Sequence, residues 1–193
     1  MRLYSRTKEA FEQELTGAAL PLALSRAEYL MGLAFRAAGR NGEAAAFFEQ
    51  GIARAEDALE IAPSPEGYRL LGTNIAFLCE VRRSWGFTNY RRIEENAGKA
   101  LALDPDNFAA RYLIAASSVA SPWPLGNVRR GYALLAELAG ENPEALEHED
   151  RFNLYLMLEA ACLKQNKDGE ARVWHERAGA IYPGNMFIGL LVK

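Results

Sequence analysis

Apolar side chains recur every three or four positions along most of this chain, in stretches separated by short segments rich in glycine, asparagine and proline. That spacing places the apolar residues on one face of a helix. Glycine and asparagine accept the left-handed conformation that ends a helix, and proline cannot continue one. The pattern therefore predicts an all-α fold, in which an N-terminal helix is followed by four helical pairs. The predicted helices span residues 5–16, 20–38, 43–62, 66–82, 89–103, 107–120, 127–140, 149–165 and 168–181.

Two sequence markers recur with the same period. The first is an alanine-rich phrase that ends in proline, and the second is a Tyr-Leu or Arg-Leu phrase inside the first helix of each pair. A fixed period of about 40 residues indicates stacked helical hairpins, in contrast to one closed globule. The markers are Pro63, Pro105, Pro143 and Pro183 for the first phrase, and Tyr29, Arg69, Tyr112 and Tyr155 for the second.

The period predicts a single helical-repeat domain over residues 1–193, a superhelical α-solenoid of about four antiparallel hairpins. The apolar segment 186–193 follows the last repeat, and two roles stay open for it. It either seals the last hairpin as a C-terminal cap or mediates self-association. The four repeats cover roughly residues 20–63, 66–105, 107–143 and 149–185.

Local signals refine this pattern. Asp106, Asn107 and Asn127 are natural helix N-caps, because their side-chain oxygens can accept from a free backbone N–H. Small residues are expected where two helix backbones approach closely. These residues are Gly32, Gly72, Ala58, Ala100, Ala115 and Ala178.

The last repeat resembles the tetratricopeptide repeat family. Residues 152–185 have that family's length and carry its tyrosine, leucine, alanine and proline positions. The resemblance implies a groove, formed by the first helix of each pair, that binds another protein or a peptide. The matching positions are Tyr155, Leu158, Ala171, Ala178 and Pro183.

The first repeat matches the family's pattern in its first part and departs from it in its second helix. It carries Gly32 and Phe48 at the family's spacing, but its Ala58 and Pro63 arrive about two helical turns late. Such elongated repeats are also similar to the helical-repeat component associated with TRAP-type solute transporters. That likeness implies an exported protein that pairs with a substrate-binding protein, although the lipid-anchoring cysteine of that component is missing here.

Composition and charge narrow the classes of function. The net charge of −3 argues against a nucleic-acid-binding protein. No stretch reaches the roughly 18 apolar residues that span a bilayer, so no membrane insertion is expected. The apolar run 17–24 follows Glu9, Glu12 and Glu14, which is unlike a signal peptide. The chain is therefore expected to be cytoplasmic, or exported if an upstream signal was removed.

The chain offers little material for catalysis. Its two histidines are His148, in an acidic turn, and His175, in the last predicted helix. Cys79 and Cys162 lack a CxxC spacing and are expected to be buried thiols. Motifs for nucleophilic, metal-dependent or phosphate-binding chemistry are missing. We therefore expect no enzymatic activity, no catalytic residue, no cofactor and no metal ion.

Two predicted turns carry the clearest surface signal. They cover residues 85–90 and 122–126 and contain Trp85, Phe87 and Trp123. Tryptophan and arginine are strongly enriched at the hot spots of protein interfaces. Either these aromatic side chains form a platform for a partner peptide or an anionic group, or they fold back and seal the helix ends.

An arginine pair follows each of these turns. Arg91 and Arg92 follow the first, and Arg129 and Arg130 follow the second. Both pairs lie at or near predicted helix starts, where positive charge is mildly unfavourable, and this favours a role in binding.

One residue in the first helix of each repeat is a candidate for lining the binding face that the resemblance implies. In the alternative interpretation these side chains pack between repeats. They are Tyr29, Arg69, Tyr112 and Tyr155. Together the features favour a non-catalytic adaptor or scaffold that binds another protein or a peptide. The alternative is an exported ligand-binding component of a solute transporter, which an enclosed pocket in place of an open groove would favour.

Overall fold

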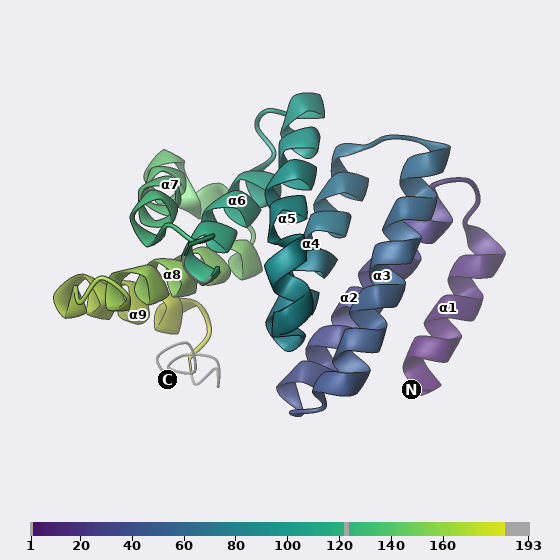
Figure 1. Cartoon of the computed structure of the whole chain (residues 1–193), viewed down its shortest axis with the longest axis horizontal. Coiled ribbons are helices and arrows are strands. Elements are labelled where there is room, and N and C mark those ends of the chain that lie inside the picture. Colours follow the sequence, from purple (N-terminus) through teal and green to yellow (C-terminus); the bar gives the residue numbers. More distant parts are fainter. Residues whose placement is uncertain (1, 122–123, 184–193) are drawn as a thin grey trace. The chain divides into compact units, whose positions relative to one another are not determined.

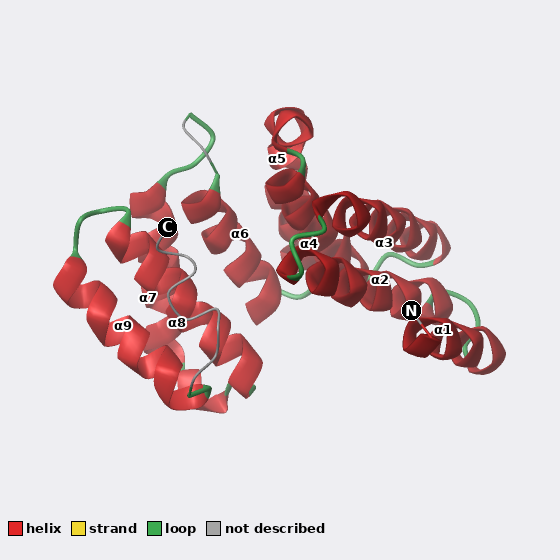
Figure 2. Ribbon diagram, turned by 90° about the horizontal axis from the view of Figure 1, so that it is seen from below, coloured by secondary structure: helices red, strands yellow, loops and turns green. Residues whose placement is uncertain are grey.

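The computed structural model of the chain describes residues 2–121 and 124–183. Within these ranges it contains nine α-helices, one short 3-10 helix and no strand, which confirms the all-α prediction (Figure 1). The chain divides into two compact units, Met1–Leu113 and Ile114–Lys193, and the division falls within the sixth helix. Short loops connect most of the helices (Figure 2).

The helices follow the predicted pairs. The first unit holds α1 (Arg2–Glu14), α2 (Ala19–Ala37), α3 (Asn41–Ile61), α4 (Pro65–Val81), α5 (Arg83–Leu103) and the first part of α6 (Phe108–Ala120). The second unit holds the rest of α6, α7 (Val128–Glu141), η1 (Pro143–Ala145), α8 (His148–Leu163) and α9 (Asp168–Ile181). The sequence places eight of the nine described helices to within about three residues.

The exception is α5, because the predicted turn over residues 85–90 is wrong. This segment is helical, and Arg82 alone separates the end of α4 from the start of α5. A Cβ atom at Gly86 would lie 3.1 Å from the carbonyl oxygen of Cys79, so the first turns of α5 run close against the end of α4. The glycine that reads as a turn signal in the sequence permits this close helix contact instead.

Side-chain caps begin several helices as expected. The side-chain oxygen of Asn107 accepts from the backbone N–H of Ala110, and that of Asn127 accepts from the backbone N–H of Arg130, each at 3.0 Å. Ser64 caps α4 in the same way. These contacts satisfy backbone donors that have no partner inside the helix.

The first unit stacks its helices in chain order. α2 packs against α3, α3 against α4 and α4 against α5, as Figure 1 shows, while α1 packs against α2 and contributes no buried residue. Phe48 and Ile75 are fully buried in the shared core. A Cβ atom at Gly32 would overlap the ring of Phe48, so the glycine makes room for this buried side chain.

The second unit has a core of its own. α7 packs against α8, and α8 against α9. Leu135, Leu154 and Leu158 are fully buried. A Cβ atom at Gly131 would lie 2.6 Å from a methyl carbon of Val119, so α7 and α6 approach closely where the glycine stands.

Candidate functional site

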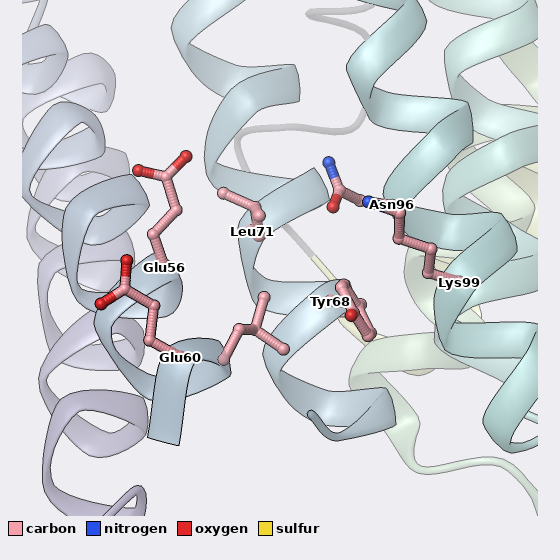
Figure 3. Close-up of a pocket in the computed structure, with 7 residues that line it drawn as sticks. Glu56, Glu60, Tyr68, Leu71, Asn96 and Lys99 are labelled. Atoms are coloured by element: carbon pink, nitrogen blue, oxygen red, sulfur yellow. The ribbon is translucent and has the colours of Figure 1, made fainter. Parts of the chain in front are cut away.

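An open groove of about 340 Å³ crosses three consecutive helices of the first unit (Figure 3). Its apolar lining consists of Leu59 on α3 and of Leu71 and the ring of Tyr68 on α4. Asn96, which is 6% exposed, lines it from α5. Exposed charged residues complete the lining. They are Glu56 and Glu60 on α3 and Lys99 on α5. We call this site the α3–α4–α5 groove.

The turn between α3 and α4 builds one end of the groove. Ser64 caps α4 and Pro65 occupies its first turn, which fixes the direction of α4 as it leaves the turn. A Cβ atom at Gly67 would lie 2.8 Å from a methyl carbon of Leu59, so the glycine lets α4 lie close to the end of α3. Tyr68, the next residue of α4, lines the groove.

Of the charged residues that line the groove, one forms an ion pair with a described residue and two do not. Arg92 of α5 reaches Glu56 of α3 at 2.9 Å and joins the two walls. The amine of Lys99 lies 5.5 Å from the centroid of the Tyr68 ring. Within the described part of the chain, neither Lys99 nor Glu60 forms an ion pair, so both remain available to a bound molecule.

Sequence reasoning did not find this groove. Its floor residues are ordinary leucine, tyrosine and asparagine positions of amphipathic helices. The one available signal is the opposite charge of Glu56 on α3 and Arg92 on α5. It becomes informative only when the structure shows that these two helices face each other.

The N-terminal half of α5 carries four of the predicted partner-binding residues, and these four differ in exposure and in their contacts. Phe87 is 59% exposed and Arg91 is exposed. Trp85 is half-buried, and Arg92 is held by Glu56 and by the side-chain oxygen of Asn89. Arg91 and Arg92 lie in the third turn of α5, so the helix-dipole argument for this pair was wrong.

The second arginine pair lies where the sequence placed it. Arg129 and Arg130 are exposed in the first turn of α7. Trp123, which was expected beside them, lies outside the described residues. The same holds for the segment 186–193.

Three of the four candidate residues in the first helices of the repeats contact other aromatic rings. The ring of Tyr29 lies 5.4 Å from that of Phe77, and Tyr112 stacks on Phe108 at 6.1 Å. Tyr155 is 5% exposed and lies 5.6 Å from Trp174 on α9, so it packs within its own repeat.

Arg69, the fourth member, is held by Glu66 through two hydrogen bonds of 2.7 and 2.6 Å. A binding role for Tyr29, Arg69 and Tyr112 stays a prediction.

Each unit also buries a carboxylate. Glu28 in α2 is 1% exposed, and it accepts a hydrogen bond of 3.2 Å from the hydroxyl of Tyr4 in α1. Burial raises the pKa of Glu28, and burial together with the nearby Glu28 carboxylate raises the pKa of Tyr4 to about 12. Glu159 in α8 pairs with Nδ1 of His175 at 3.0 Å. Both carboxylates keep one buried oxygen without a partner.

We expect His175→Ala to lower the free energy of unfolding by about 1 kcal/mol, because it removes the partner of the buried Glu159 carboxylate. The cost is limited because the His175 side chain is 45% exposed, so water can replace part of the contact. Urea denaturation measures the change. A double variant that also carries Glu159→Gln should recover part of the loss, and unchanged stability of His175→Ala would contradict this account.

The described residues hold no cluster of three histidine, cysteine, aspartate or glutamate side chains that could bind a metal ion. Cys79 and Cys162 are both buried free thiols, as expected, and burial raises the pKa of Cys79 to about 12. A thiol with so high a pKa is not an activated nucleophile. Among the helices described, none combines the length and the apolar character that crossing a bilayer requires.

Comparisons with protein-family models and with curated proteins give no match for this chain.

Proposed function

We propose that the chain is a non-catalytic, tetratricopeptide-like interaction module, an adaptor that binds a segment of another protein in the α3–α4–α5 groove. The observation that supports this proposal is the combination of an apolar floor with unpaired charges at the rim. Half-buried Leu59 offers apolar surface to a side chain, while Leu71, which also lines the groove, is only 6% exposed. Glu60 and Lys99 offer opposite charges at the two sides of the groove. A volume of about 340 Å³ fits a few side chains of a bound segment.

The open form of the groove favours a protein segment over a small ligand. Small-molecule sites usually bury most of the ligand's surface. Here Glu56, Glu60 and Lys99 are exposed, and the groove opens to solvent across three helices. A segment that continues beyond both ends of the groove uses such a surface better than a compact ligand does. The exported, ligand-binding alternative gains no support from this geometry.

Site-specific photo-crosslinking tests the proposal. Benzoylphenylalanine is placed at Glu60 or at Lys99, and for a control at Arg26, an exposed position of α2. In a lysate of the source organism we expect both groove positions to crosslink the same protein and the control position not to do so. That protein is then identified and purified, and its affinity for a variant carrying Glu60→Arg and Lys99→Glu should fall at least tenfold. Crosslinking from neither groove position, or equally from all three, would contradict the proposal.

A further inference from the structure

A second surface of α5 carries an exposed aromatic side chain between two arginines. Arg83, Phe87 and Arg91 are spaced by four residues, which places them on one face of the helix. Phe87 is 59% exposed, and both arginines are exposed. Neither arginine forms an ion pair with a described residue. We call these three residues the Arg–Phe–Arg stripe.

The two neighbouring arginines differ from Arg83 and Arg91, because each of them forms an ion pair within the first unit. Arg82, just before α5, pairs with Glu49, and Arg92 pairs with Glu56, both on α3. These contacts explain the positions of Arg82 and Arg92 by packing within the first unit. Nothing comparable explains Arg83 and Arg91.

The stripe is separate from the α3–α4–α5 groove. Phe87 and Asn96, a groove residue, are nine positions apart on α5, which is about two and a half turns, so they point to opposite sides of the helix. Lys99, the other groove residue of α5, lies eight positions beyond Arg91, about 12 Å farther along the helix. A substitution at Phe87 therefore leaves the groove intact.

We propose that the Arg–Phe–Arg stripe binds an acidic segment of a partner protein. An apolar side chain of the partner packs on Phe87, and a carboxylate on either side of it pairs with Arg83 and with Arg91. Charge complementarity supports this choice, because the stripe presents two unpaired cations and arginine binds carboxylates in a two-pronged geometry. The inference rests on the proposed function in one respect, namely that the molecule bound is a protein.

Helix geometry specifies the spacing in the partner. Arg83 and Arg91 are eight positions apart on α5, which is a rise of about 12 Å. In an extended segment the first, third and fifth side chains share one face, and the first and fifth residues lie about 13 Å apart. The stripe therefore fits the pattern acidic–any–apolar–any–acidic in an extended segment.

The surroundings of the stripe favour a short acidic segment over a nucleic acid. Glu94 and Glu95 follow Arg91 by about one turn and are exposed, so the positive patch ends there. The whole chain has a net charge of −3. A long polyanion needs a wider basic field than two arginines provide.

A peptide titration tests the inference with no need for the natural partner. The probe is an acetylated and amidated peptide of sequence Ser-Glu-Thr-Ile-Thr-Glu-Ser, and the comparison peptide has lysine in place of both glutamates. Binding to the full chain is followed by amide chemical shifts at low ionic strength, where exposed ion pairs are screened least. We expect shifts centred on residues 83–91 and at least tenfold tighter binding of the glutamate peptide.

Matched variants locate the contact. The double variant Arg83→Glu and Arg91→Glu should bind the lysine peptide more tightly than the glutamate peptide. The Phe87→Ala variant should bind the glutamate peptide at least threefold more weakly than the wild type does. The control is Arg26→Glu with Leu30→Ala, an exposed arginine and leucine four residues apart on α2, which should change nothing. Circular dichroism confirms that each variant is folded.

Three results would overturn the inference: no shifts in the stripe, equal binding of both peptides, or tighter binding of a single-stranded oligonucleotide than of the glutamate peptide. The groove residues take no part in this titration. Failure here therefore leaves the crosslinking test of the proposed function unaffected, and failure of that test leaves the peptide result standing.

Discussion

Replacing Gly51 with alanine should lower the free energy of unfolding by about 3 kcal/mol, because it adds a methyl group where a buried polar network has no room. Gly51 lies on α3, and a Cβ atom there would overlap the side-chain amide of Asn74 on α4. That amide is fully buried and donates to the carbonyl of Leu70 at 3.0 Å and to the hydroxyl of Ser25 at 3.3 Å. Ser25 in turn donates to the carbonyl oxygen of Gly51 at 2.8 Å.

The network joins three helices, so displacing one member costs more than the added methyl group alone. If the Asn74 side chain moves, the hydroxyl of Ser25 loses a buried contact and the amide loses its acceptors. A buried polar group without a partner costs about 1–3 kcal/mol, and overpacking a core costs a similar amount. Thermal and urea denaturation of the variant measure the sum.

Gly98 provides the matched control on α5. Nothing lies within 4 Å of a Cβ atom at this position, and the residue is exposed. Gly98→Ala should therefore raise the free energy of unfolding by roughly 0.5–1 kcal/mol, which is the ordinary gain of alanine over glycine inside a helix. Equal effects of the two substitutions would contradict the account given for Gly51.

The sequence predicts most of the fold because its helix signals are local. Apolar spacing marks the buried face of each helix, and residues such as Asn107 and Asn127 begin helices through contacts within one turn. The start of α5 could not be predicted in this way. Gly86 and the aromatic residues around it carry turn signals, and the helix forms there because Gly86 fits closely against Cys79 on α4. That contact depends on the packing of two helices.

The candidate sites were predictable only in part, and for the same reason. The sequence names Phe87 and Arg91 as candidate partner-binding residues, but it does not single out Arg83, the third member of the stripe. The groove depends on which residues of α3 and α5 face each other across α4. Likewise, nothing in the sequence shows that Gly51 lies against Asn74, 23 residues farther along the chain.

Replacing Glu28 with glutamine should raise the free energy of unfolding by about 2 kcal/mol at neutral pH, because it removes a charge that is poorly compensated in the fold. Glu28 is 1% exposed, and one of its oxygens has no partner. The other accepts from Tyr4, and the guanidinium of Arg54 approaches it only to 3.9 Å. A glutamine keeps the shape and can still accept the hydrogen bond of Tyr4.

The effect should depend on pH in a definite direction. Burial is the largest cause that raises the pKa of Glu28, and Tyr4 and Arg54 offset it only in part. A carboxyl whose pKa is higher in the folded state favours folding below its unfolded pKa of about 4.3 and loses that contribution as the pH rises through the folded value. The advantage of Glu28→Gln over the wild type should therefore be largest at neutral pH and should vanish near pH 4.

Urea denaturation of both proteins between about pH 4 and pH 8 measures this difference, since other titrating groups act on both chains alike. Glu56→Gln is a suitable control, because Glu56 is an exposed carboxylate on the same unit and pairs with Arg92 at the surface. Its effect should stay within about 0.5 kcal/mol at every pH. An advantage of Glu28→Gln that grows as the pH falls would show that the buried carboxylate is stabilised by Tyr4 and Arg54 more than burial destabilises it.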